Sequence, residues 1–171
     1  MRGRTLLILV SLLALAVAAP GAAVAKRGGT DRPWKGRASG TLTFDIGTTP
    51  IPAMATGTGR LSHLGKSTYS QEFTITLTGP TTFSIAGTQT IEAANGDMLF
   101  LTFTGTGELA GAFGVGQASE TTAVFTVTGG TGRVSDASGT LTSTVFTEVT
   151  SIVFTTVTAT QSSRLRGRIS Y

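Results

Sequence analysis

The sequence predicts an all-β protein: an eight-stranded antiparallel closed barrel that follows a cleaved N-terminal signal peptide helix. Three observations predict it. Apolar and polar side chains alternate with period two through most of the chain, glycine-rich turns separate the alternating segments, and an uncharged apolar run opens the sequence. The 171 residues, of which 40% are hydrophobic and 13% charged, correspond to one domain.

The first 25 residues have the organisation of a secretory signal peptide. Arg2 and Arg4 precede an uncharged run, and Ala23 and Ala25 are the small residues that a signal peptidase reads. The run is shorter than the ~20 apolar residues of a transmembrane helix. We therefore expect residues 1–25 to be a signal peptide, residues 26–35 a basic tail and residues 36–171 one β-barrel domain. The general secretory pathway would export it to the periplasm or the extracellular space.

The strands are predicted from alternation. Tyr69, Phe73 and Ile75 share one face of a strand, whereas Glu72 and Thr74 share the other. Threonine is the usual outward residue, because its β-branched side chain suits a pleated surface. Asn95-Gly96 predicts a type I′ hairpin turn. The turn residues delimit eight strands, at residues 36–45, 53–62, 67–78, 82–94, 97–107, 119–128, 139–149 and 152–168.

Eight antiparallel strands can close on themselves, which removes the sheet edges that would otherwise promote aggregation. A barrel of eight strands is either filled by side chains or holds one small ligand. Trp34, the only tryptophan, is expected to cover a barrel mouth.

Few residues offer catalytic or metal-binding chemistry. The chain has no cysteine, and His63 is its only histidine, which excludes structural zinc. Asn95 and Asp97 are too few for a calcium loop. Ser62 and His63 are adjacent on the chain and point to opposite faces of a strand, so they do not form a nucleophilic pair. We expect no catalytic residue, no metal and no cofactor.

Charge is distributed unevenly in the predicted mature chain. Its two ends are basic and its body is acidic, without the continuous cationic track that nucleic acid requires. We therefore expect no nucleic-acid partner. The basic ends would either be solvated tails or contact anionic lipid or wall polymers.

The predicted lumen contains polar groups among aromatic ones. Gln71 and Gln89 fall on the apolar faces of their strands, and buried polar groups need partners. They would either orient a ligand or hydrogen bond to each other. Glu72 and Glu92 are expected to point outward. The candidate lumen residues are Tyr69, Gln71, Phe73, Phe83, Gln89 and Phe125, and we also expect Phe100, Phe103, Phe146 and Phe154 to line the cavity.

The turn motifs carry a family resemblance. The segment from Val127 to Gly139, with its Gly129-Gly130-Thr131-Gly132-Arg133 core, is similar to the turn segment of dirigent proteins and allene oxide cyclase-like barrels. Together with residues 94–97 and 57–65, it also resembles small secreted bacterial proteins of unassigned function. The resemblance implies an eight-stranded barrel with an apolar lumen that receives a hydrophobic substrate or a radical-derived intermediate. The matched positions are structural glycines, so no catalytic residue follows from it.

Several functions remain open at this point. The preferred interpretation is a secreted, non-enzymatic barrel that binds a small hydrophobic molecule in its lumen or is simply filled, with no stable membrane insertion after signal cleavage. The alternatives are a cyclase or isomerase of the allene oxide cyclase or dirigent type, and a structural protein of the cell envelope. Leu165, Ile169 and Tyr171 alternate as in outer-membrane barrels, but a threonine exterior with few aromatic residues is unlike a lipid-facing surface.

Overall fold

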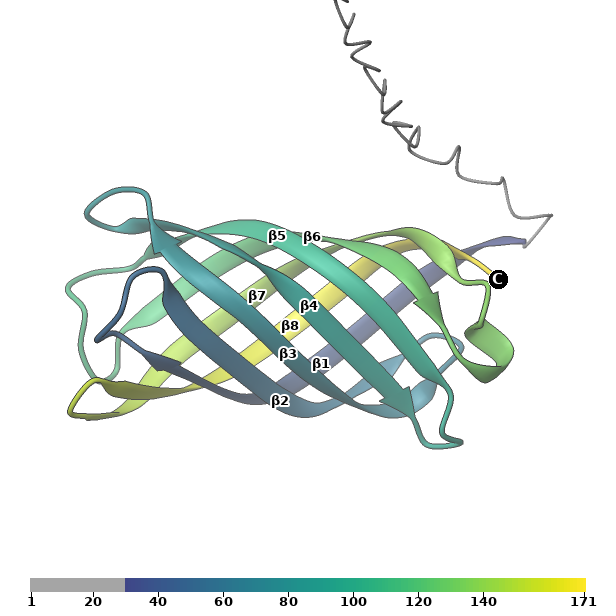
Figure 1. Cartoon of the computed structure of the whole chain (residues 1–171), viewed down its shortest axis with the longest axis horizontal. Coiled ribbons are helices and arrows are strands. Elements are labelled where there is room, and N and C mark those ends of the chain that lie inside the picture. The colour runs from purple at the N-terminus through teal and green to yellow at the C-terminus, as the bar shows by residue number, and fades with distance from the viewer. Residues whose placement is uncertain (1–29) are drawn as a thin grey trace, which may run out of the picture.

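Antiparallel pairing joins each strand to the next and the last strand to the first, so the sheet closes into a barrel (Figure 1). The computed structural model describes residues 30–171. The predicted signal peptide and residues 26–29 lie outside this range. The strands are β1 (Asp31–Asp45), β2 (Ile51–Leu61), β3 (Gly65–Leu77), β4 (Thr82–Ala93), β5 (Met98–Leu109), β6 (Ala118–Gly130), β7 (Ser138–Val153) and β8 (Thr156–Ser170).

The seam between the first and last strands is long and regular. β1 pairs with β8 from Asp31 opposite Ser170 to Asp45 opposite Thr156. A closed sheet leaves no strand with a row of unpaired backbone groups. The predicted fold class, an all-β closed barrel of eight antiparallel strands, is therefore confirmed. Within residues 30–171 no helix is both long and apolar enough to cross a lipid bilayer.

Alternation along the strands separates the lumen from the exterior. On β6, Ala123, Phe125 and Val127 are buried, whereas Thr122 and Thr126 are exposed. The same pattern holds for Glu72 on β3 and Glu92 on β4, which are exposed as expected. The period-two pattern of the sequence is thus the pattern of inward and outward side chains.

Two local predictions are wrong. β1 begins at Asp31, so residues 31–35 belong to the barrel rather than to a basic tail. Asn95-Gly96 does join the predicted pair of strands, but only Gly96 has a positive φ, of 84°. A type I′ turn requires positive φ at both central residues. The four-residue connection from Ala94 to Asp97 is therefore a different turn.

One end of the barrel, called here the packed end, is filled with apolar side chains and holds both the start of β1 and the C-terminus (Figure 1). Trp34, Leu99, Leu141 and Ile169 are at most 1% exposed there. Trp34 therefore fills the barrel from inside, whereas the sequence predicted a cover over a mouth.

Loops seal the packed end. The Trp34 ring lies 6.2 Å from the His63 ring, which lies 5.9 Å from the Tyr171 ring. At the same end, Arg133 donates a hydrogen bond to Asp97 over 2.7 Å, and Asn95 donates to the same carboxylate oxygen over 2.7 Å. Residues 94–97 and the segment from Val127 to Gly139, two of the three segments with the family resemblance, are thus bonded to each other.

Candidate ligand-binding site

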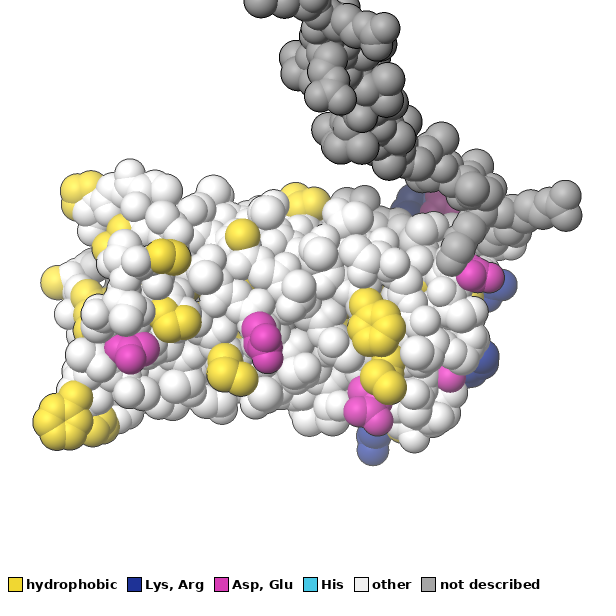
Figure 2. All heavy atoms as spheres, viewed as in Figure 1, with side chains coloured by type: hydrophobic (Ala, Val, Ile, Leu, Met, Phe, Trp, Pro, Cys, Tyr) yellow, Lys and Arg dark blue, Asp and Glu magenta, His cyan; other side chains and the backbone are white. Residues whose placement is uncertain are grey.

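A cavity of about 390 Å³ occupies the barrel from its middle to the end opposite the packed end. This second end, called here the open mouth, is formed by residues 46–50, 78–81, 110–117 and 154–155. Ile46, Leu77 and Phe113 line the cavity and are 40%, 62% and 43% exposed. The cavity therefore reaches the surface at the open mouth. Figure 2 shows hydrophobic side chains gathered at this end of the molecule.

All six residues predicted for the lumen line this cavity: Tyr69, Gln71, Phe73, Phe83, Gln89 and Phe125. Tyr69, Gln71 and Phe73 come from β3, Phe83 and Gln89 from β4, and Phe125 from β6. Alternation places them there, because successive inward positions on one strand lie two residues apart. Their role in binding a ligand stays a prediction.

Phe103 lines the cavity as expected, but three other phenylalanines do not. Phe100 is 37% exposed, Phe146 is 49% exposed and Phe154 is 96% exposed. Phe100 stands between Leu99 and Leu101, so the strand is apolar on both faces and its sequence does not show which residue points inward. Phe154 belongs to the short turn between β7 and β8 and has a positive φ of 56°.

Aromatic rings form one wall of the cavity. The Phe73 and Phe103 rings meet edge to face at 5.6 Å, and the Phe125 ring lies 4.9 Å from Phe103. Nearer the mouth, Phe44 and Phe113 are 6.3 Å apart in a second edge-to-face pair. Phe44 and Phe113 were not among the predicted residues. This wall comes mainly from β1 to β5, which also contribute isoleucines to the lining.

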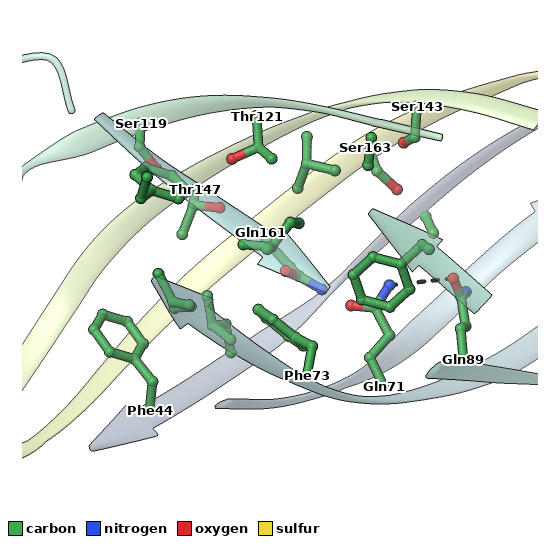
Figure 3. Close-up of a pocket in the computed structure, with 18 of the residues that line it drawn as sticks. Phe44, Gln71, Phe73, Gln89, Ser119, Thr121, Ser143, Thr147, Gln161 and Ser163 are labelled. Atoms are coloured by element: carbon green, nitrogen blue, oxygen red, sulfur yellow. Dashed lines mark hydrogen bonds between the residues drawn. The ribbon is translucent and has the colours of Figure 1, made fainter. Parts of the chain in front are cut away.

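A hydroxyl-rich wall, which the sequence analysis missed, faces the aromatic one (Figure 3). It comes from β6, β7 and β8 and consists of Ser119, Thr121, Ser143, Thr147, Gln161 and Ser163. The neighbours of these residues on the strand are often polar as well, as Thr142 and Thr144 are beside Ser143. Without a polar-to-apolar contrast, alternation could not show which face was inward.

Two side-chain hydrogen bonds join different strands on the inner surface of the barrel. Gln71 Nε2 donates to Gln89 Oε1 over 3.1 Å, which is one of the two arrangements expected from the sequence. Gln161 Nε2 donates to the Tyr69 hydroxyl over 2.8 Å. Burial raises the pKa of Tyr69 above its ordinary value of 10.0, and the Gln161 hydrogen bond opposes that shift. Tyr69 is therefore a neutral phenol near physiological pH.

Ser143 is a fully buried polar group of the wall that has no hydrogen-bond partner among the described residues. Its side chain is 2% exposed. A buried hydroxyl left unpaired costs about 1–3 kcal/mol. The half-buried Ser119 and Ser163 of the same wall line the cavity and are accessible there to a hydroxyl or carbonyl group of a ligand.

The described lining of the cavity contains no Asp, Glu, His, Lys or Arg. His63, the only histidine, lies at the packed end, where its Nε2 is 3.2 Å from the Pro33 carbonyl oxygen. No group of three or more His, Asp and Glu side chains in residues 30–171 could hold a metal ion. The site can therefore offer a ligand apolar contact and neutral hydrogen bonds.

No family model, curated protein or solved structure shows significant similarity to the chain.

Proposed function

We propose that this protein binds a small, uncharged and largely apolar molecule in its lumen, with the polar edge of the ligand on the hydroxyl-rich wall. The observation that carries the proposal is the cavity of about 390 Å³ between the aromatic wall and the hydroxyl-rich wall. Binding sites of small molecules have volumes of about 300–1,000 Å³ and combine apolar lining with a few placed polar groups. The lumen has both properties.

The lining favours a neutral ligand over an ionised one. A carboxylate placed in the cavity would lose hydration without meeting a cation, because the described lining has none. Burying an unpaired charge is far more costly than burying a hydroxyl that finds a hydrogen bond. An alcohol, ketone or ester of terpenoid or long-chain type therefore fits better than the free acid of the same size.

The open mouth supplies the route into the lumen. Its exposed apolar side chains would contact the ligand before it enters. Phe113 and Leu77 belong both to this rim and to the cavity lining. Export by the signal peptide of residues 1–25 forms part of the proposal, and it would place the protein where exogenous apolar molecules occur.

The test is equilibrium binding of the neutral fluorescent probe N-phenyl-1-naphthylamine, followed by displacement with dodecanol or dodecanoate at a pH where the acid is ionised. Saturable binding and stronger displacement by the alcohol are expected. The variant Ser163→Phe fills the lumen and should abolish binding, whereas Ser162→Phe places the same ring outside on the same strand and should leave it unchanged.

Two results would contradict the proposal. One is the absence of saturable binding to the folded protein by any neutral apolar probe. The other is equal binding by the Ser163→Phe and Ser162→Phe variants, since the probe would then occupy an outer surface. Circular dichroism of both variants establishes that the barrel is intact.

A further inference from the structure

The outer face of the barrel carries a row of four cations across four neighbouring strands. Arg37 on β1 stands directly opposite Arg164 on β8 and, on its other side, opposite Arg60 on β2. Arg60 in turn stands opposite Lys66 on β3. All four side chains are exposed. Neighbouring strands lie about 4.8 Å apart, so the row presents one positive charge per strand spacing. We call these four residues the cation row.

Within residues 30–171 no carboxylate forms an ion pair with the row. Opposed like charges in a sheet destabilise it. None of the four cations has an ion pair or a side-chain hydrogen bond with another residue of the described chain. Arg166 opposite Lys35 adds two more cations beside the row. Figure 2 shows that Lys and Arg of the visible face lie only at the packed end.

Hydroxyl groups form a second row parallel to the first. Ser39 stands opposite both Ser162 and Thr58, and Thr58 stands opposite Thr68. Each lies two residues from a member of the cation row and is exposed on the same face. Arg37, Arg60 and Lys66 line a shallow groove together with Ser39, Thr58 and Thr68. Glu92 is the one carboxylate in the lining of this groove.

We propose that the two rows bind a linear acidic polysaccharide that runs across the strands of β8, β1, β2 and β3. The cation row would pair with carboxylate or sulfate groups repeated along the polymer, and the hydroxyl row would hydrogen bond to the sugar hydroxyls beside them. The positions of the two rows hold no aromatic side chain on which a nucleobase could stack, and no apolar side chain that could enter a bilayer. A saccharide polymer is therefore favoured over RNA and over a lipid surface.

The probe for the test is polygalacturonate, a linear polysaccharide with one carboxylate per sugar, measured by calorimetry at several salt concentrations. Binding should weaken steeply as salt rises, because the polymer releases counterions when the row neutralises it. The fully methyl-esterified polymer, which has the same chain without the charges, should not bind.

The key variant is Arg37→Gln/Arg60→Gln, which interrupts the middle of the cation row. Affinity at low salt should fall at least about tenfold, and the slope of log affinity against log salt should decrease by about two. Because the change removes opposed like charges, the variant should melt at the same temperature as the original or higher. A loss of binding therefore cannot be ascribed to unfolding.

A matched variant distinguishes the effect of the position of the four cations on binding from the effect of net charge. Arg37→Gln/Arg60→Gln/Thr102→Arg/Thr126→Arg restores both charges at exposed positions that stand opposite each other on β5 and β6. It should bind as weakly as the double variant. Recovery of binding would show that net charge suffices and would overturn the proposal. Tighter binding to polyuridylate or to phosphatidylglycerol vesicles than to polygalacturonate would also overturn it.

Discussion

The Tyr69 hydroxyl on β3 accepts a hydrogen bond from Gln161 on β8 although two strands, β1 and β2, lie between them. The intervening inward positions are Gly40 and Gly57, and a Cβ at Gly57 would lie 2.7 Å from Tyr69 Cε1. The absence of side chains at these two positions lets the tyrosine ring lie along the barrel wall. The bond thereby links two distant strands and fixes two polar groups at the border between the aromatic and hydroxyl-rich walls.

The Tyr69–Gln161 hydrogen bond should contribute measurably to stability. Tyr69→Phe leaves the Gln161 amide in the barrel without its partner, and the free energy of unfolding should fall by about 1–2 kcal/mol. Urea denaturation of Tyr69→Phe, Gln161→Leu and the double variant forms a double-mutant cycle. A destabilisation of the double variant smaller than the sum of the single ones is expected. Strict additivity would mean that the bond contributes nothing.

Tyr69 should also make stability fall at alkaline pH. Its pKa is raised in the folded protein, so above pH 10.0 the unfolded chain loses this proton while the folded chain keeps it. Unfolding is therefore favoured as pH rises from the unfolded pKa to the folded one. Denaturant midpoints measured from pH 8 to above pH 10 should decline more for the original protein than for Tyr69→Phe. An equal decline of the denaturant midpoint with pH in the original protein and in Tyr69→Phe would contradict the burial of this phenol.

The aromatic wall should be a main source of packing energy. Phe103 is 4% exposed and contacts both Phe73 and Phe125, so Phe103→Ala should cost about 3–5 kcal/mol. Phe146 is 49% exposed on the outer face, and Phe146→Ala should change stability by no more than about 0.5 kcal/mol. Equal losses in urea denaturation would mean that Phe103 does not pack in the core.

The Asp97–Arg133 ion pair should stabilise the packed end in a pH-dependent manner. The hydrogen bonds from Arg133 and then Asn95 hold the pKa of Asp97 below its ordinary value of 3.8. A lowered folded pKa adds stability above the unfolded pKa, and this stability is lost as pH falls through the folded pKa. Asp97→Asn should therefore lower the melting temperature at pH 7 and make no difference in strong acid. If Asp97→Asn lowered the melting temperature equally at pH 7 and in strong acid, the loss would come from packing and not from the ion pair.

The sequence predicts those parts of the barrel in which polar and apolar residues contrast. Around Tyr69 and Phe73 on β3 each inward residue is flanked by serine, threonine or glutamate, and alternation locates the lumen side correctly. On the last strands the inward Ser143 and Ser163 are flanked by residues that are also polar. Alternation therefore does not predict the hydroxyl-rich wall. The face of such strands is decided by register with their neighbours, which is information that a single strand does not contain.

The start of β1 was missed for a related reason. Lys35 was assigned to the basic tail of residues 26–35, yet it occupies an outward position of β1 between inward Trp34 and Gly36. Because charged residues are frequent at the start of β1, the period-two alternation of this segment was not detected in the sequence. Likewise, the cation row depends on registers between four strands, so the sequence shows that cations are concentrated near the chain ends but not that they stand opposite one another.

Methyl NMR during titration with a neutral apolar ligand such as dodecanol tests the central claim most directly. Ile75 and Ile85 line the cavity, whereas Ile169 lies in the packed end and is fully buried. Ligand in the lumen should shift the Ile75 and Ile85 methyl signals in a saturable manner and leave Ile169 unchanged. Saturation of the ligand signal with no movement of Ile75 or Ile85 would contradict a binding site in the lumen.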